Sequence, residues 1–223
     1  MTFSIVARCE RTGQFGMAVS SSSPAVAARC AHAAAGIGAV ASQNVTDPRL
    51  GHEALRLMAA GATAAEAVAA LAGGRFAEYR QILAVDRAGG VAIHSGAKAL
   101  GVAAEALGAG CVAAGNLLGD AGVPAAMLAR FAGASGPLAA RLVAALRAGL
   151  DAGGEAGPVH SAGLLVVREE AWPYVDLRCD WTEGCPVAAL EAAWAVYAPQ
   201  ADAYVTRALD PGAAPSYGVP GDE

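Results

Sequence analysis

Strand pairs alternate with helix pairs along this chain, and this order constrains the fold more than any single motif does. The first strand pair is a hairpin in which apolar residues 2–9 and 15–19 flank a polar turn that contains glycine. Capping signals at residues 47–48 and 63–66 then predict two consecutive helices. A second hairpin, over residues 82–94, follows these helices.

The second half of the chain continues the alternation. A short strand over residues 111–114 precedes two helices, over 124–131 and 137–150, and the second helix carries leucines at four-residue spacing. A third strand pair, over 163–167 and 174–177, comes next. Hairpin turns this short imply antiparallel sheets, and consecutive helices suit layers on the outside of a sheet sandwich.

A short helix and a strand are expected between the first hairpin and the first helix pair. Ser23 and Pro24 have the side chains typical of a helix N-cap and of the first helical position. Residues 36–42 are small and apolar, which favours a strand.

The order of elements predicts an α/β (α+β) fold, a four-layer αββα sandwich of two stacked antiparallel sheets with helices outside each. A generic α+β layer fold would give a similar order. Helices over 187–197 and 202–209 complete the prediction, and in a chain of 223 residues we expect one domain over residues 1–209. Residues 210–223 hold few apolar side chains to anchor them, so a loose C-terminal tail is expected there.

The composition argues against several classes of protein. Hydrophobic residues make up 55% of the chain, but charged residues or glycine clusters interrupt every apolar stretch before it reaches the length of a membrane span. A net charge of −5 without a basic patch argues against nucleic-acid binding. The apolar start is too short for a signal peptide, and the five cysteines are widely spaced, as expected of thiols in a reducing compartment. We therefore expect a cytoplasmic protein that binds neither membranes nor nucleic acids.

Thr2 is the leading candidate for a catalytic nucleophile. Methionine aminopeptidases remove Met1 when the second side chain is small, and this would leave a free α-amine beside the Thr2 hydroxyl. The hydroxyl is then the nucleophile and the neighbouring amine is its base. Because an α-amine has a pKa of roughly 7.7–8.0, it accepts a proton near neutral pH. Many proteins begin with Met-Thr and are not enzymes, so an ordinary first-strand residue is the alternative.

The first hairpin is expected to place Thr2 beside a group of hydroxyls. If Cys9 lies opposite Phe15, antiparallel pairing puts Thr2 opposite Ser22, within about one residue of slip. Alternation along the strand also puts Thr2 and Ser4 on the same face of the sheet.

Several segments of the chain resemble a known family. They are TFSIVAR at residues 2–8, TGQFGMAV at 12–19, SSPAVAARCAHAAAGIGAVASQN at 22–44, EYRQILAVD at 78–86, IHSGA at 93–97, AGNLL at 114–118, SAGLLVV at 161–167 and VDLRCD at 175–180. Over roughly residues 1–198, these segments are similar to the family called domain of unknown function 1028, which is grouped with the N-terminal nucleophile (Ntn) hydrolases.

The resemblance implies the αββα sandwich and, by analogy, hydrolysis of an amide, without naming the substrate. We therefore expect an Ntn amide hydrolase that acts on a small amide or peptide-like molecule through Thr2, once Met1 is removed. Two alternatives stay open. One is a non-catalytic module that binds a small molecule on the same fold, and the other is a hydrolase with a different nucleophile, such as Ser21.

Three further residues are candidates for catalytic roles. Ser21 and Ser22 are expected to hold or polarise Thr2, because buried hydroxyls near the end of a strand need partners. Asn116 follows a strand beside Gly115, a suitable place for a side-chain amide directed at a developing oxyanion. The alternative roles are turn formation for the serines and capping for the asparagine.

His94, His160 and Ser161 are the candidates for substrate contacts. His94 ends a strand, and His160 and Ser161 begin another. A histidine that only satisfies the end of a hairpin is the alternative for His94. Family members typically carry basic and glutamine residues in the loop before Ser161, and this chain departs from that pattern at residues 155–160.

No cofactor or metal ion is expected. The four histidines lack metal-ligand spacing. The glycine-rich stretches lack the Lys-Ser/Thr pair of a phosphate-binding loop.

The C-terminal quarter of the chain holds an unusual share of its aromatic residues. They are Trp172, Tyr174, Trp181, Trp194, Tyr197 and Tyr204, and they include all the tryptophans. Large aromatic side chains often anchor interfaces, so we expect a symmetric homodimer. The alternative is that these aromatics seal the core beneath the last helices.

Overall fold

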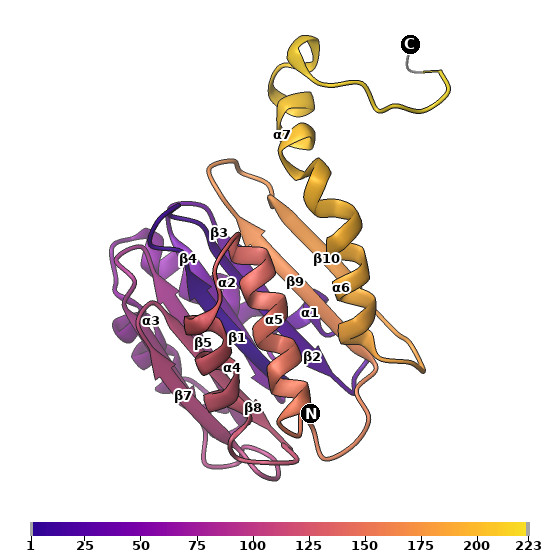
Figure 1. Cartoon of the computed structure of the whole chain (residues 1–223). Helices are drawn as coiled ribbons and strands as arrows, with labels where there is room; N and C mark the ends of the chain where they lie inside the picture. The colour runs from indigo at the N-terminus through magenta and orange to yellow at the C-terminus, as the bar shows by residue number, and fades with distance from the viewer. Residues whose placement is uncertain (1, 222–223) are drawn as a thin grey trace.

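The computed structural model describes residues 2–221 and contains a six-stranded sheet at its centre (Figure 1). Its strands lie in the order β10-β9-β2-β1-β8-β7, and neighbouring strands are antiparallel. Their bounds are β1 Thr2–Arg8, β2 Phe15–Ser21, β7 Ala104–Gly108, β8 Cys111–Asn116, β9 Ser161–Val167 and β10 Val175–Cys179.

A four-stranded antiparallel sheet lies against the first sheet, with the strand order β3-β4-β5-β6. Its strands are β3 Ala31–Ala34, β4 Gly38–Asn44, β5 Arg80–Asp86 and β6 Val91–Ser95. Hairpins of short connection build most of both sheets, as the sequence predicts.

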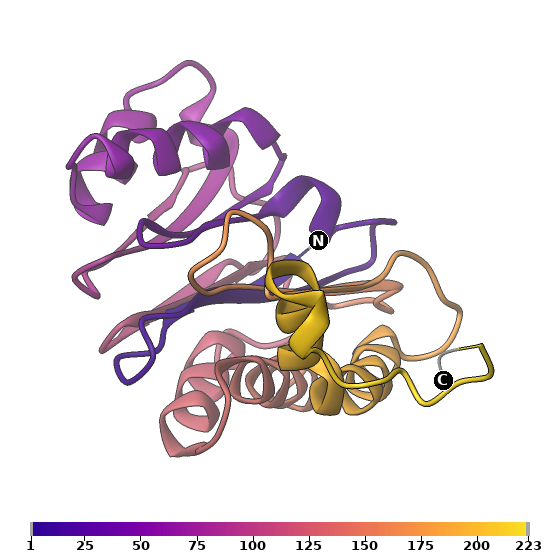
Figure 2. The same ribbon diagram turned by 90° about the horizontal axis from the view of Figure 1, so that it is seen from above.

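Helices cover the outer face of each sheet, as Figure 2 shows from above. Helices α2 (Pro48–Ala59) and α3 (Ala64–Ala72) lie on the four-stranded sheet, and α4 (Val123–Gly133), α5 (Leu138–Asp151) and α6 (Pro186–Tyr197) lie on the six-stranded sheet. The expected four-layer αββα sandwich is confirmed.

Capping residues mark the start of both helices on the four-stranded sheet, α2 and α3. The Asp47 side chain accepts a hydrogen bond from the Arg49 N–H, and Pro48 occupies the first helical position of α2. At the start of α3, Thr63 and Glu66 form a reciprocal capping box. These side chains satisfy N–H groups that a helix start would otherwise leave unpaired.

Three apolar clusters hold the four layers together. The middle cluster lies between the two sheets and includes Val6, Met17 and Leu83. The two outer clusters join each sheet to its helices. Phe3 contributes to the cluster beneath α4, α5 and α6, and Ile82 to the cluster beneath α2 and α3. Since Phe3 and Val6 belong to different clusters, β1 buries both of its faces.

The first hairpin differs by one residue from the predicted register. Arg8, not Cys9, pairs with Phe15, while the Cys9 N–H donates to the Gln14 carbonyl at 2.8 Å. The hydrogen-bonded pairing of β1 with β2 extends to the Cys9–Gln14 bond because Gly13 closes the turn. Gly13 does so in a left-handed conformation (φ 71°) that favours glycine. Extending the same register by one residue places Thr2 opposite Ser21 and not opposite Ser22.

The segment after the first hairpin also differs from the prediction. Helix α1 is a single turn over Ala27–Cys30, and its N-cap position is Val26, without a side-chain cap. Ser23 and Pro24 precede the helix in a turn, so the prediction that Ser23 caps it is wrong. Strand β3, which the sequence analysis missed, follows directly, because its alanine-rich sequence lacks the β-branched residues of a recognisable strand. Strand β7 was missed as well.

The segment after α6 extends away from the sandwich (Figure 1). The short 3₁₀ turn Ala198–Gln200 joins α6 to α7 (Ala201–Leu209), and another such turn covers Pro211–Ala213. The sequence predicts a loose tail over residues 210–223. Two carbonyls of this tail, those of Pro215 and Ser216, accept hydrogen bonds from the Arg207 side chain of α7. Residues 222–223 lie outside the described part. Over residues 2–221, no helix has both the length and the apolar character that a membrane crossing requires.

Candidate active site at the start of β1

A row of four polar residues crosses the six-stranded sheet where β1 begins. Thr2 pairs with Asn116 of β8 on one side and faces Ser21 of β2 on the other, and Ser21 pairs with Ser161 of β9. Residues paired across strands place their side chains on the same face of the sheet. This face is the one that meets the second sheet, because Val6 and Met17 on it belong to the cluster between the sheets. All four residues are buried, and Thr2 is 4% exposed.

A second polar row faces this one from the four-stranded sheet. Gln43 of β4 pairs with Gln81 of β5, and Gln81 pairs with Ser95 of β6. The Ser4 hydroxyl of β1 bridges the sheets by donating to Gln43 Oε1 at 2.6 Å. The space between the sheets is therefore apolar in its middle and polar at the end where β1 starts.

Backbone carbonyls fix the orientation of the buried amides. Gln43 Nε2 donates to the Ala114 carbonyl at 3.3 Å, and Gln81 Nε2 donates to the Gly115 carbonyl at 3.2 Å. Because a carbonyl only accepts, these nitrogens cannot be exchanged with their oxygens. Gln81 Oε1 is consequently an acceptor, and it receives hydrogen bonds from Gln43 Nε2 at 2.7 Å and from Asn116 Nδ2 at 3.2 Å.

This network leaves the Asn116 carbonyl oxygen without a partner. Asn116 is 0% exposed, and its Oδ1 is a buried atom that receives no hydrogen bond from residues 2–221. A buried polar atom in this state costs roughly 1–3 kcal/mol, which calls for an explanation. The sequence predicts that Asn116 donates to an oxyanion. Gln81 engages one N–H of the Asn116 amide, whose nitrogen carries a second N–H, and the free acceptor Oδ1 lies in the row beside Thr2.

Ser21 connects Thr2 to the segment that follows β2. The Thr2 and Ser21 hydroxyl oxygens lie 3.5 Å apart, and the Ser21 Oγ accepts the Ser23 N–H at 3.0 Å. Ser161 fixes the same segment, since its hydroxyl donates to the Ser23 carbonyl at 2.6 Å and accepts the Val26 N–H at 3.2 Å. The expected hydroxyl cluster is thus present, but the Ser161 hydroxyl hydrogen-bonds the backbone of the turn after β2 and is not free to contact a substrate.

Three non-glycine residues next to the two rows have positive φ angles. Asn44 (φ 72°) directly follows Gln43, and Leu117 (φ 51°) directly follows Asn116. Ala25 (φ 51°) lies in the turn after Ser21. Non-glycine residues rarely adopt this conformation, and strain of this kind concentrates at functional sites.

Glu155 is a buried carboxyl that the sequence analysis did not assign to the site. Both of its oxygens accept the Ser22 N–H, at 3.1 and 3.2 Å, and a bridge to Leu118 fixes its backbone near the end of β8. Burial raises the pKa of Glu155 to about 7, although its hydrogen bonds with Ser22 oppose that shift. The available signal was a lone acidic residue in a glycine-rich loop shortly before Ser161.

Comparison with known proteins places the chain in a family. The model of a family of unknown function, DUF1028, matches residues 2–190. A solved structure of a protein from Silicibacter pomeroyi, described as DUF1028, is 31% identical, with a TM-score of 0.82 over 88% of this chain and 85% of the other. The chain belongs to the DUF1028 family.

A second solved structure, Anbu (ancestral beta-subunit) from Yersinia bercovieri, aligns with this DUF1028 protein over 91% of the chain and 97% of its own length. The identity is 10% and the TM-score 0.40, a likeness too weak to carry a conclusion. Curated proteins gave no match.

The two histidines expected to contact substrate lie outside the Thr2 row. His94 pairs with Ile82, so it faces the outer helices, where its Nε2 lies 2.9 Å from the Ala77 carbonyl. The His160 N–H donates to the Ser21 carbonyl, but its ring stacks on Trp181 at 4.3 Å. Ser22, a predicted catalytic residue, is linked to Glu155 through its backbone N–H. In residues 2–221, no three His, Cys, Asp or Glu side chains are grouped to hold a metal ion.

Proposed function

We propose that this DUF1028 protein is an Ntn hydrolase that cleaves a small amide or peptide-like substrate with Thr2 as its nucleophile. The proposal requires removal of Met1, which lies outside the described residues. One observation carries it. Thr2 begins the central strand of the sandwich inside a buried polar row, beside the unpartnered Oδ1 of Asn116.

The first half of the reaction uses only groups of the row and the substrate. The Thr2 hydroxyl gives its proton to the Thr2 α-amine as its oxygen attacks the substrate carbonyl carbon. The resulting tetrahedral intermediate breaks its C–N bond, and the ammonium returns the proton to the leaving amine. An ester between Thr2 and the acyl group remains.

Water completes the cycle. The α-amine takes a proton from a water molecule, whose oxygen attacks the ester carbonyl, and the Thr2 oxygen leaves and is protonated. The products are a carboxylic acid and the regenerated N-terminal threonine.

The surroundings of Thr2 suit an amine that must act as a base. Apart from Glu155, which holds the Ser22 N–H, the side chains described here are hydroxyls and carboxamides. Burial favours the neutral form of an amine, and Glu155 does not oppose this while it keeps the proton that its raised pKa favours. The free Asn116 Oδ1 provides an acceptor for an N–H of that amine, which would direct its lone pair toward the hydroxyl. Ser21, whose oxygen lies 3.5 Å from that of Thr2, orients the nucleophile.

Intact-mass measurement of the protein from its native host is the first test, and a chain that keeps Met1 would end the proposal. The second test treats the trimmed protein with a strained cyclic ester, a β-lactone, that acylates activated hydroxyls, and maps the adduct by peptide mass spectrometry. An adduct on Thr2 is expected. An adduct on Ser21 would favour the alternative nucleophile, and no adduct on trimmed, folded protein would favour the non-catalytic binding module.

We also propose that the protein forms a symmetric homodimer through its C-terminal aromatics. The six residues divide into two groups. Tyr174, Trp194 and Tyr197 pack against the core beneath α6, as the alternative role requires, whereas Trp172, Trp181 and Tyr204 are 40%, 51% and 40% exposed. Only the exposed group is available for an interface. Sedimentation at micromolar concentration tests the proposal, and a monomer mass would contradict it.

A further inference from the structure

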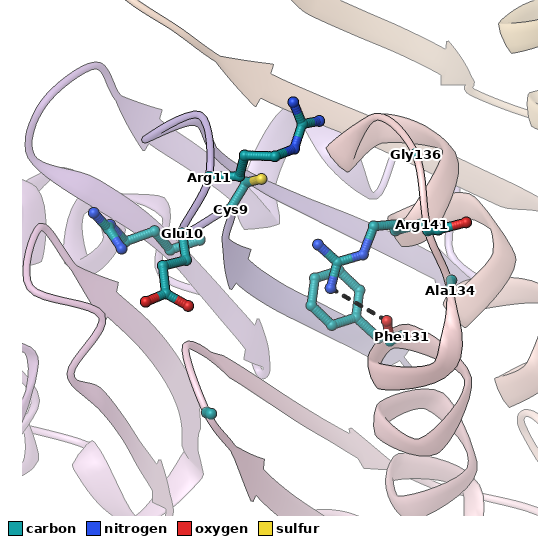
Figure 3. Close-up of a pocket in the computed structure, with 10 residues that line it drawn as sticks. Cys9, Glu10, Arg11, Phe131, Ala134, Gly136 and Arg141 are labelled. Carbon is teal, nitrogen blue, oxygen red and sulfur yellow. Dashed lines mark hydrogen bonds between the residues drawn. The ribbon is translucent and has the colours of Figure 1, made fainter.

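A cavity of about 480 Å³ lies at the end of β1 opposite to Thr2 (Figure 3). Because a strand advances about 3.3 Å per residue, Arg8 at this end is about 20 Å from Thr2. The turn after β1 forms one wall with Cys9, Glu10 and Arg11, and Phe131 of α4 and Arg141 of α5 form the other.

Three arginines line this cavity, and the structure gives them no carboxylate partner. Among the described residues, no ion pair within 4.0 Å joins Arg8, Arg11 or Arg141 to an acid, and Glu10 in the same wall is also unpaired. Five arginines elsewhere in the described chain do pair with an acid, as Arg147 does with Glu191 at 2.6 Å. The lining therefore carries a net positive charge that the protein itself does not neutralise.

Two of these guanidinium groups hold buried nitrogens without a partner. The Nε atoms of Arg8 and Arg141 are buried and make no hydrogen bond. The Arg141 group lies over the Phe131 ring at 4.0 Å and donates to the Phe131 carbonyl at 3.3 Å, as the dashed line in Figure 3 marks. Buried donors of this kind are usually satisfied. Arg80 and Arg207 carry them as well, so the feature supports a missing acceptor here only together with the unpaired charges that line the cavity.

The field of Arg141 reaches the opposite wall of the cavity. Burial of Cys9 opposes ionisation of its thiol, yet hydrogen bonds with Thr12 and the backbone, together with the charge of Arg141, leave the pKa of Cys9 below its usual value. The positive charge of Arg141 therefore favours a negatively charged group in this cavity.

We propose that this cavity, the arginine cavity, binds a small organic anion whose phosphoryl or carboxyl groups pair with Arg8 at one edge of the cavity and with Arg141 at the other. Guanidinium groups match the geometry of both oxyanions and bind them through paired hydrogen bonds. A volume of about 480 Å³ is within the range of sites for organic ligands, so the cavity has room for a carbon scaffold as well as for the charged group. The Phe131 ring supplies an apolar surface for part of that scaffold.

Calorimetric titration of the full chain with inorganic phosphate, citrate and glycerol 3-phosphate tests this proposal and separates phosphoryl from carboxyl recognition. We expect at least one organic anion to bind more tightly than inorganic phosphate. Arg8→Gln and Arg141→Gln should each weaken its binding about tenfold or more, the loss expected for one charge-assisted contact.

Two variants control for folding and for general charge. Arg11 is exposed, so Arg11→Gln should fold normally and still weaken binding, whereas Arg130→Gln, at an exposed position of α4 outside the cavity, should leave affinity within about twofold. Losses in the cavity variants no larger than in Arg130→Gln would overturn the proposal. Failure of all three anions to bind at about 10 mM would overturn it too, since specific ligands bind well below this concentration.

Discussion

The two ends of β1 differ in how their polar side chains are paired. At the Thr2 end, hydroxyls and carboxamides hydrogen-bond to one another, and among the described residues the acceptor Asn116 Oδ1 remains without a partner. At the Arg8 end, unpaired cations line an open cavity. A neutral, closed row suits a nucleophile and an amine that must stay unprotonated, whereas a charged cavity suits recognition of an anion. One strand thus joins a region suited to chemistry with a region suited to binding.

The largest expected effect separates the two ends by reactivity. In the chain without Met1, Thr2→Ala should slow acylation by a β-lactone by about a thousandfold or more, because no other group combines hydroxyl and amine. Thr2→Ser should retain most of the rate, since the hydroxyl remains. Thr12→Ala, in the turn at the other end of the hairpin, is the matched control and should react like wild type. Adduct formation followed by mass spectrometry measures all three.

The second effect is on folding at the Thr2 end. Gln81→Leu should lower the free energy of unfolding by roughly 3–5 kcal/mol, because it leaves the Gln43 and Asn116 nitrogens and the Gly115 carbonyl without a shared partner. Urea denaturation measures this loss. Gln200→Leu, at an exposed position, should change stability by less than about 0.5 kcal/mol. Equal losses in both variants would show that the amide network contributes no more than a surface glutamine.

The third effect is a pH dependence confined to the Thr2 end. Burial raises the pKa of Glu155 to about 7, so the folded state holds this proton more tightly than the unfolded chain. Between the ordinary glutamate pKa and about 7, the folded state binds more protons, and stability therefore falls as pH rises. The whole loss is roughly 3–4 kcal/mol and is complete above the folded pKa.

Glu155→Gln should remove this part of the pH dependence, measured by urea denaturation at several pH values. Exposed Glu169→Gln is the control and should keep the wild-type slope. A slope unchanged in Glu155→Gln would mean that the pKa of the carboxyl is not raised in the folded protein.

The sequence was sufficient for the layers of the fold and for the place of Thr2. Hairpin turns and capping residues such as Thr63 act locally, so they can be read without knowing the rest of the structure. Alternation alone placed Thr2 and Ser4 on one face. The register differs by one residue, within the slip that the prediction allows, because the conformation of Gly13, and not the apolar pattern, closes the turn.

The partners of the row could not be predicted in the same way. Gln43 and Gln81 are far apart in the sequence, and each resembles an ordinary polar strand residue until the two sheets stack. Glu155 reaches Ser22 across 133 positions of sequence. Arg8 and Arg141 line the same cavity only because α5 packs beneath the sheet that contains β1. Such contacts depend on how layers pack, and periodicity carries no information about that.

The smallest expected effect tests the Arg8 end without a ligand. The contacts of the Arg141 guanidinium with the Phe131 ring and carbonyl are offset by the cost of its buried, unpaired Nε, so Arg141→Gln should change the free energy of unfolding by less than about 0.5 kcal/mol. Arg147→Gln, on the same helix, breaks a two-bond ion pair with Glu191 and should cost about 1 kcal/mol. Addition of an anion that fills the arginine cavity should raise the Tm of wild type and of Arg147→Gln but not of Arg141→Gln. A large loss in ligand-free Arg141→Gln would show that this arginine is held for the fold, and the contrast between the two ends of β1 would then fail.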